Sequence, residues 1–401
     1  MRAYRLLPEP LAVYATVIEQ PVQRPGSTEA IPVVFVSSHS QRGGSERYLA
    51  ILLEQLDPAW VQCVVCLQSG PFVDDLRAAG HPTEVIETGA RPAAQLASAR
   101  RLRSLLRRSG AAVVHANGIK AAVVAVLATR RSGIPVVWFK HDVSHDGWLA
   151  RAVAARCSAV VAASSAVTAT FSDAQRKKVH VVDHQIPEPR VDPHEARRRV
   201  LDALAADEPV TVVALVGRLD PLKGHRELLE LAPALLESVP TLRFLFVGGD
   251  DPSHREHAGR LRREVGERRL DHAVVFTGHR NDAAALIAGS DLLAVPSVTD
   301  RRGLGAEAGP YVALEALALG TPVVGYAQGA LPERLGESGI LVPMRDRPAL
   351  AEAIVRLARD EGLRARLAAS GRRRFEQRFR LGTLASKVTE HYRRAARTAR
   401  P

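Results

Sequence analysis

The chain has 401 residues, of which 46% are hydrophobic, so it is long enough for two domains that each have a core. Aromatic residues make up 4%, so these cores must consist mainly of Ala, Val and Leu. The formal charge of +12 arises from 55 basic and 43 acidic residues spread along both halves. This distribution excludes a concentrated basic patch and supports only a weak preference for anionic ligands or an anionic membrane.

Cysteine content and the amino-terminal region indicate the compartment. Three cysteines exclude a disulfide framework and are typical of a reducing cytoplasm. Cys63 and Cys66 resemble a redox or zinc pair, but on a strand residues three apart point to opposite faces, so we expect core residues. No apolar run reaches about 18 residues. Residues 1–30 read as an extension without a signal peptide, so we expect a cytoplasmic protein, with peripheral contact at the inner membrane face as an option.

Apolar strands alternate with helices through residues 31–190. We expect strands at 31–38, 61–67, 83–86, 111–118, 134–142 and 158–165, and helices at 45–56, 71–80, 93–109 and 120–133. This alternation is typical of a parallel sheet with helices on both faces. The helix at 93–109 has leucines on one side and arginines on the other, as on a surface helix or one lying on an anionic membrane. These arginines are Arg100, Arg101, Arg103, Arg107 and Arg108.

The alternation breaks near residues 184–209, which read as a linker, and then resumes to residue 380. Strands are expected within 209–220, 242–251, 273–282 and 291–300, and then at 321–324 and 339–342. The sequence therefore predicts an α/β protein of two Rossmann-like doubly wound domains, 31–190 and 191–380, with a ligand cleft between them. The last of three terminal helices, within 381–401, could cross back to the first domain.

Residues 307–324, EAGPYVALEALALGTPVV, hold two glutamates eight positions apart. Pro310 suits the first position of a helix, and Gly320 would end that helix. Glu307 then lies in the preceding loop, and Glu315 lies about one and a half turns into the helix. The amides of Tyr311, Val312 and Ala313 lie between them as unpaired donors and predict an anion site. A sugar, a diphosphate and a second sugar would fit this order of groups.

Seven motifs carry a family resemblance: RGGSERYLAILLEQL, VVHANG, KHD, VGRLDPLKG, DLLAVPS, EAGPYVALEALALGTPVVG and ESGILVP. In this order and spacing the chain resembles a retaining glycosyltransferase of family 4, with the GT-B fold, from residue 32 onward. The resemblance implies transfer of a sugar from a nucleotide-diphosphate sugar to a small-molecule or lipid acceptor. The first domain would bind the acceptor and the second the nucleotide-sugar. Neither a cofactor nor a metal is expected, since no Asp-x-Asp motif is present.

The resemblance also implies roles for individual residues. Glu307 would contact the transferred sugar, His141 would lie beside it, and Arg218 and Lys223 would neutralise the diphosphate and stabilise the leaving nucleotide. Glu315 would bind the ribose hydroxyls. The remaining donor-binding residues would be Gly43, Gly44, Gly278, His279, Arg280, Gly309, Tyr311, Val312 and Ala313. His115 and Asn117, at the end of a strand, are candidate acceptor contacts.

Two departures from the family pattern lie near the expected position of the donor sugar. Ala308 and Gly309 stand where the family often has Gly and an aromatic residue, and the stretch 300–306 resembles an insertion. His145 and Asp146 could suggest a metal site, but loop residues at this spacing have no enforced common face. The adjacent aspartates of GGDDPSH are expected to shape a loop.

Other function classes remain open. A nucleic-acid-binding protein is disfavoured because aromatic residues are not interleaved with basic ones. A dinucleotide oxidoreductase is disfavoured because no G-x-G-x-x-G motif follows an expected strand. A related enzyme that couples a non-sugar cyclitol donor in the same site is an alternative that the sequence does not separate from a glycosyltransferase.

Overall fold

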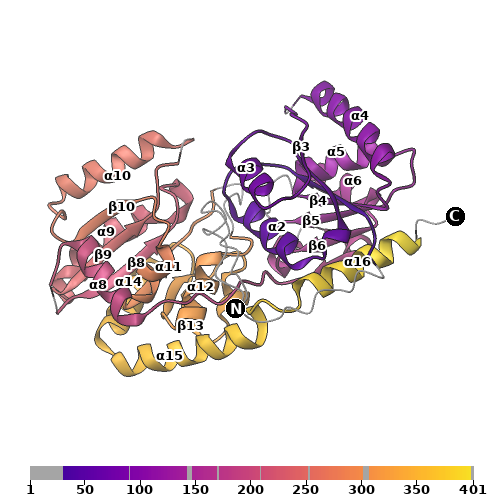
Figure 1. Cartoon of the computed structure of the whole chain (residues 1–401). Helices are drawn as coiled ribbons and strands as arrows, with labels where there is room; N and C mark the ends of the chain where they lie inside the picture. The colour runs from indigo at the N-terminus through magenta and orange to yellow at the C-terminus, as the bar shows by residue number, and fades with distance from the viewer. Residues whose placement is uncertain are drawn as a thin grey trace, which may run out of the picture. The chain divides into compact units, whose positions relative to one another are not determined.

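The computed structural model describes residues 30–89, 91–141, 147–168, 171–207, 209–251, 253–300 and 307–398. The chain divides into two compact units, one formed by Met1–Pro187 with Leu381–Pro401 and the other by Glu188–Arg380 (Figure 1). Each unit contains one parallel β-sheet, as the sequence predicts for two doubly wound domains.

The sheet of the first unit has seven strands in the order β3-β2-β1-β4-β5-β6-β7. Its strands are β1 (Val33–Ser37), β2 (Val61–Cys66), β3 (Thr83–Val85), β4 (Val113–Asn117), β5 (Val136–Lys140), β6 (Ala159–Ala162) and β7 (Val179–Val181). Its helices are α2 (Gly44–Gln55), α3 (Pro71–Ala78), α4 (Pro92–Ser109), α5 (Ile119–Thr129), α6 (Trp148–Arg156), α7 (Asp173–Arg176) and α16 (Leu384–Thr398). All residues of β1, β4 and β5 are buried, as expected for strands covered on both faces.

The sheet of the second unit has six strands in the order β10-β9-β8-β11-β12-β13. Its strands are β8 (Thr211–Val216), β9 (Leu242–Val247), β10 (Val274–Gly278), β11 (Leu292–Val295), β12 (Val323–Tyr326) and β13 (Gly339–Val342). Its helices are α8 (Pro193–Leu204), α9 (His225–Ser238), α10 (Arg255–Glu267), α11 (Ala283–Ala288), α12 (Tyr311–Leu319), α13 (Leu331–Leu335), α14 (Arg347–Arg359) and α15 (Glu361–Arg374).

Both sheets have a topological switch point, where consecutive strands pass from one side of the first strand to the other. In the first unit it lies between β1 and β4, and in the second between β8 and β11. Loops that follow two such strands diverge in opposite directions, so the carboxyl ends of the strands leave a crevice there. These two places are where a ligand site of each unit is expected.

Several elements differ from the sequence prediction. The supposed linker at 184–209 contains α8, which Asp192 caps by accepting from the amide of Glu195, and α8 packs against α11. The segments α6, α7, β7 and α13 were missed because they are short or carry weak periodicity. Cys63 and Cys66 lie in β2, and burial raises the pKa of each thiol to about 11, in agreement with core residues.

The arginine-rich helix α4 is partly different from the surface helix that was expected. Leu102, Leu105 and Leu106 are buried as predicted. Arg103 does not belong with the exposed arginines, because its guanidinium donates to the carbonyls of Ala128 at 2.8 Å and Leu127 at 2.7 Å. A cation at the last carbonyls of α5 satisfies acceptors that the helix leaves unpaired.

The carboxyl-terminal helix α16 belongs to the first unit and packs against α2, β4 and β5 (Figure 1). Tyr392 and Val388 of this helix are fully buried. The turn before α16 is held by Gln185, whose side-chain oxygen accepts from the amides of Gly382 and Thr383. Among the described residues, no helix is both long and apolar enough to span a bilayer.

Candidate functional site

The loops that follow β8 and β11 touch each other at the switch point of the second unit. Gly224 has φ +81°, and a Cβ atom on it would lie 2.0 Å from the carbonyl oxygen of Pro296. The amide of Val298 donates to the carbonyl of Leu222 at 2.8 Å. Glycine is required at position 224 both for the left-handed backbone and for this close approach. The backbone contact therefore fixes the two loops relative to each other.

Lys223 and Glu307 form an ion pair across this switch point. The ammonium of Lys223 lies 2.5 Å from Oε1 of Glu307, and the hydroxyl of Ser297 donates to the same oxygen at 2.9 Å. The side chains of Lys223 and Glu307 are 33% and 13% exposed, so the pair is largely shielded yet open on one side. The residue predicted to contact the transferred sugar, Glu307, and one predicted to neutralise the diphosphate, Lys223, thus contact each other directly.

The backbone of Glu307 is held by the turn that follows β12. Its carbonyl accepts from the amide of Ala330 at 2.6 Å, and its amide donates to Oε1 of Gln328 at 3.3 Å. Gly329 has φ +56°, and a Cβ atom there would lie 2.3 Å from the carbonyl oxygen of Glu307. The loop that carries the glutamate is therefore anchored at its backbone on one side and at its carboxylate on the other.

Helix α12 begins just after Glu307 and differs in one detail from the prediction. Pro310 is the N-cap residue, with Tyr311 as the first helical residue and Gly309 in the loop before it. The amide of Ala313 donates to the carbonyl of Pro310 at 3.1 Å, so its prediction as an unpaired donor is wrong. Val312 and Glu315 are partly exposed and, being three apart, share one side of the helix. An anion site at this helix start would therefore rest on its first two amides.

Arg218 already has a carboxylate partner in the second unit. Its guanidinium lies 2.5 Å from Oδ2 of Asp251, and its side chain is 63% exposed. Asp251 also accepts from the amide of Ser253, so it shapes its loop as the sequence analysis expected. The neighbouring Asp250 pairs with Arg262, which holds the pKa of that carboxyl below its usual value. An incoming diphosphate would have to share Arg218 with Asp251.

Asp220, Asp251 and His254 bring possible ligand atoms within 4.8 Å of one another. The arrangement is a poor cation site, because the guanidinium of Arg218 already neutralises Asp251. His145 and Asp146, the other residues considered for a metal, lie outside the described residues, as does most of the stretch 300–306.

Gly278, His279 and Arg280, three of the predicted donor-binding residues, stand at the carboxyl end of β10 and in the loop after it. Gly278 has φ +71°, and its carbonyl accepts from the amide of Gly248 at 2.9 Å. His279 is exposed, whereas Arg280 pairs with Asp282 at 2.7 Å and holds the pKa of that carboxyl below its usual value. The side chain of Arg280 is thus occupied, which leaves the backbone of this loop for a ligand.

At the switch point of the first unit, Gly118 follows β4 and has φ +95°. A Cβ atom there would lie 2.7 Å from Oγ of Ser38, which accepts from the amide of Ala121. Gly43 and Gly44, which are predicted donor-binding residues, are the N-cap and the first residue of α2. Glu46 in the first turn is buried, and this burial raises the pKa of its carboxyl.

The predicted residues His141, Asn117 and His115 of the first unit lie together behind this switch point. Nε2 of His141 is 2.6 Å from Oδ1 of Asn117, and the amide group of Asn117 donates to the carbonyl of Ser45 at 3.1 Å. Asn117 is 1% exposed, so it positions His141 and the start of α2. This burial does not support the predicted contact between Asn117 and an acceptor.

His115 has a structural environment as well. Its ring is fully buried, stacks on Phe139 with 4.0 Å between ring centroids, and has Nδ1 at 2.5 Å from the hydroxyl of Tyr392. Burial, and then the nearby His141, lower the pKa of His115 well below its usual value. The prediction of an acceptor contact at His115 therefore needs correction, because the side chain serves to dock α16.

The structure brings further residues to these places that sequence reasoning missed. Tyr48 of α2 lies with its ring 4.9 Å from that of His141 and 5.3 Å from that of His184. His184 was missed because it falls in the supposed linker. Ser297 and Gln328 were missed because each stands in a loop without a periodic pattern, and only their contacts with Glu307 identify them.

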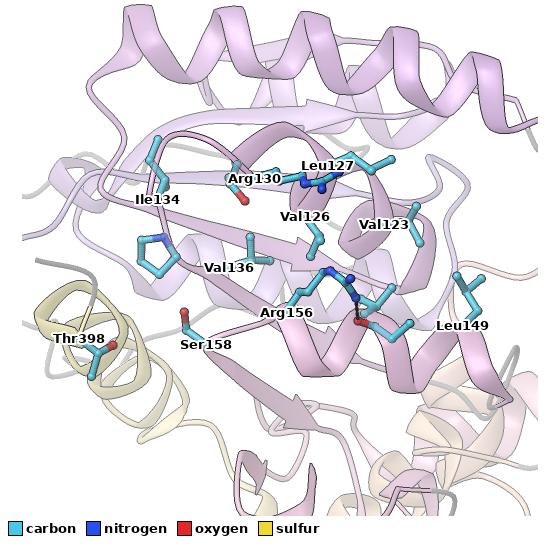
Figure 2. Close-up of a pocket in the computed structure, with 15 residues that line it drawn as sticks. Val123, Val126, Leu127, Arg130, Ile134, Val136, Leu149, Arg156, Ser158 and Thr398 are labelled. Carbon is cyan, nitrogen blue, oxygen red and sulfur yellow. Dashed lines mark hydrogen bonds between the residues drawn. The ribbon is translucent and has the colours of Figure 1, made fainter. Parts of the chain in front are cut away.

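The first unit also has a cavity of about 640 Å³ at the other end of its sheet (Figure 2). Apolar side chains of α5 and α6 line it, with Arg130 and Arg156 beside them. Ile134 and Val136 place it at the amino end of β5, whereas His141 follows the carboxyl end of that strand. The cavity is therefore separate from the switch point.

Comparison with known proteins identifies both units. Residues 42–187 match the family described as Glycosyltransferase Family 4, and residues 210–360 match Glycosyl transferases group 1. The chain is 36% identical over 216 residues to D-inositol 3-phosphate glycosyltransferase of Salinispora arenicola, covering 50% of this chain and 46% of that protein. It is 35% identical over 190 residues to phosphatidyl-myo-inositol mannosyltransferase of Mycobacterium leprae, covering 46% of each. The chain thus spans about half the length of the curated relatives that it matches.

A solved structure extends the likeness to almost the whole fold. HepE of Anabaena, in complex with UDP and glucose, superposes with a TM-score of 0.77 at 22% identity, covering 90% of this chain and 98% of that one. At this identity the likeness concerns the fold. From the two family matches and the shared architecture, we conclude that the chain belongs to the GT-B glycosyltransferases that combine a family 4 and a group 1 half.

Proposed function

We propose that the protein transfers a sugar from a nucleotide-diphosphate sugar to a small-molecule or lipid acceptor, with retention at the anomeric carbon and without a metal. The observation that carries this proposal is the Lys223–Glu307 ion pair at the switch point of the second unit. In this pair a cation and a carboxylate lie side by side where open α/β sheets bind their ligands, which supports a role of both in binding the donor.

Fixed cations replace a metal in this proposal. When the bond between the anomeric carbon and the phosphate oxygen breaks, the electron pair leaves with the diphosphate. Lys223 and Arg218 would stabilise this charge, together with the first amides of α12. Lys223 would then be shared between Glu307 and the phosphate, and Arg218 between Asp251 and the phosphate.

The acceptor hydroxyl would attack on the face from which the diphosphate leaves. Its oxygen forms the new bond to the anomeric carbon, and its proton passes to the departing phosphate oxygen, so no protein base is needed. Oε1 of Glu307 already accepts from Lys223 and Ser297, which suits a carboxylate that holds a sugar hydroxyl better than one that forms a covalent bond.

The acceptor class is proposed from the relatives. Inositol 3-phosphate and phosphatidyl-myo-inositol stand in their names, and both contain an inositol phosphate. We therefore propose a phosphorylated cyclitol, free or lipid-bound, as the first acceptor to test.

The proposal is tested by calorimetric titration of the full chain with UDP, GDP, ADP and TDP, without metal and again with EDTA. We expect one nucleotide to bind in both conditions and to lose at least about tenfold in affinity in Glu315→Ala, which removes the ribose ligand. Glu352→Ala is the matched control, because Glu352 is an exposed glutamate of α14 in the same unit. Failure of all four nucleotides to bind, or binding only with a metal, would overturn the proposal.

A further inference from the structure

Gln328 stands in the turn after β12 and has one half of its side-chain amide satisfied. The side chain is 9% exposed, and its Oε1 accepts from the amide of Glu307 at 3.3 Å. Nε2 of the same side chain is buried and has no hydrogen-bond partner within the part of the chain that the structure describes. Because a buried donor without an acceptor is unfavourable, such a group in a folded protein calls for a physical explanation.

The contact with Glu307 determines which way the amide of Gln328 is oriented. A backbone N–H can only donate, so the side-chain oxygen must face Glu307 and the NH2 group must face away from that N–H. The orientation cannot relax easily, since the turn is locked against Glu307. Gly329 would place a Cβ atom 2.3 Å from the carbonyl oxygen of Glu307, and Ala330 donates to that oxygen at 2.6 Å.

We infer that Gln328 is a specificity-determining residue, whose Oε1 positions Glu307 and whose NH2 group donates to a hydroxyl oxygen of the transferred sugar. The inference rests on the proposed function. A sugar hydroxyl can both donate and accept a hydrogen bond. At this site the carboxylate of Glu307 can accept one, while Gln328 and Lys223 can donate one. The bound sugar would then supply the acceptor that the NH2 group of Gln328 lacks.

Gln328 is assigned to the sugar and not to the nucleotide. Glu315 and Arg218 are assigned to the nucleotide, and among the described residues no hydrogen bond joins either of them to Gln328. Removing the NH2 group should therefore change the choice and turnover of the sugar while nucleotide affinity stays within about twofold. A purely structural amide would instead change stability with no effect on sugar choice.

Two variants test the contributions of Oε1 and of the NH2 group of Gln328 separately. Gln328→Met keeps the length of the side chain and removes both polar atoms. Gln328→Glu keeps an oxygen that accepts from the amide of Glu307 and replaces only the NH2 group, with an added negative charge. Gln55→Met is the matched control, because Gln55 is also buried with an unpaired amide but lies in α2 of the first unit.

The experiment measures kcat/KM for release of nucleotide diphosphate from UDP-glucose, UDP-galactose, GDP-mannose and ADP-glucose, with inositol 3-phosphate as acceptor. For the donor that the wild-type chain uses best, both Gln328 variants should lose roughly ten- to hundredfold in kcat/KM, as for one buried hydrogen bond. Gln55→Met should stay within twofold. The 2-, 3-, 4- and 6-deoxy forms of that donor then complete a double-mutant cycle.

In that cycle, one deoxy donor should be poor for the wild-type chain and no poorer for Gln328→Met, because the same hydrogen bond is already missing. Additive losses at every position, or an unchanged donor preference in both variants, would overturn the inference. If the wild-type chain binds none of the four nucleotides in calorimetry, the proposed function itself has failed. The inference about Gln328 is contradicted when the wild-type chain works and the cycle shows no coupling.

Discussion

At the switch point of the first unit, Gly118 approaches the side chain of Ser38, and at that of the second, Gly224 approaches the backbone of Pro296. Both glycines have positive φ and are the N-cap residues of helices, α5 and α9, so the two units use the same backbone conformation at this point. The chemistry beside them differs. The first has buried rings and amides around Asn117, whereas the second has a partly exposed ion pair between Lys223 and Glu307.

This difference shows how one architecture supports two tasks. In the first unit, polar groups near the switch point are buried and contact one another and α16, as Nδ1 of His115 and the hydroxyl of Tyr392 illustrate. In the second unit, the charges are paired but remain open to a ligand that can share them. The family resemblance implied ligand contacts at His115 and Asn117 as well as at Lys223 and Glu307, and burial separates these two pairs.

The largest expected effect is on stability and comes from Gly224→Ala. A Cβ atom 2.0 Å from a backbone oxygen, at φ +81°, combines overpacking with left-handed strain, and we expect a loss of about 3–5 kcal/mol. A Cβ atom in Gly118→Ala meets the side chain of Ser38, with Oγ at 2.7 Å and Cβ at 3.2 Å, and no backbone atom of the described chain, so this variant should lose less. Gly110→Ala, with φ +64° and no described atom within 4 Å of its Cβ position, should lose about 1 kcal/mol. The free energy of unfolding of the three variants is measured by urea denaturation, followed by circular dichroism. Equal losses in all three would contradict the difference expected between the two switch points.

The next effect concerns activity. Glu307→Ala should lower kcat by about 10²–10³-fold while nucleotide affinity changes only a few-fold, because the carboxylate is assigned to the sugar. Ser297→Ala removes one donor to the same carboxylate and should cost less. Steady-state kinetics and calorimetry on the same preparations check this. Full activity of Glu307→Ala together with Glu315→Ala would show that the site is assigned wrongly.

A smaller effect is expected when a buried contact of the first unit is removed: stability should fall while kcat stays the same. Tyr392→Phe removes the hydroxyl that bonds Nδ1 of His115 and should destabilise the first unit by about 1–3 kcal/mol, with kcat unchanged. Tyr326→Phe is the matched change in the second unit, where the hydroxyl donates to Glu227 at 2.9 Å. Thermal unfolding and kcat are measured for both. A fall in kcat of Tyr392→Phe without loss of stability would restore a substrate role for His115.

The smallest effect is a pH dependence of the first unit. His391 of α16 lies with its ring 4.5 Å from that of His180 in β7, and burial, followed by this neighbour, lowers the pKa of His391 to about 4. An unfolded histidine titrates near 6.5, so between pH 6.5 and 4 only the unfolded chain binds this proton. Stability should therefore be complete above pH 6.5 and fall as the pH falls through this window, by about 1 kcal/mol at pH 5.5.

The measurement compares unfolding temperatures at pH 7 and pH 5.5 for the wild-type chain and His391→Gln. The variant should lose less stability than the wild-type chain over this interval. His194→Gln, at an exposed histidine of α8, is the control and should behave like the wild-type chain. An identical pH response of all three proteins would exclude a contribution from His391.

Much of the fold could be predicted because strand and helix patterns are local. The continuous apolar strands and the glycines at helix ends predict two parallel sheets, and Gly320 indeed ends α12 with φ +73°. Helix α8 was missed because its pattern, rich in charge and following two prolines, resembles a linker. The position of Arg103 was wrong because periodicity places it on the outer arc, whereas the end of α5 supplies acceptors for it.

The sequence by itself determined the order of the motifs along the chain, the two carboxylates around the start of α12 and the cations of VGRLDPLKG. These depend on residue type and spacing along the chain. Only the tertiary structure decided that Lys223 pairs with Glu307, that Gln328 holds the glutamate, and that His115 is enclosed by α16. The physical reason is that burial and pairing are set by what packs from elsewhere in the chain, and residues 84 or 277 positions apart leave no periodic signal of their contact.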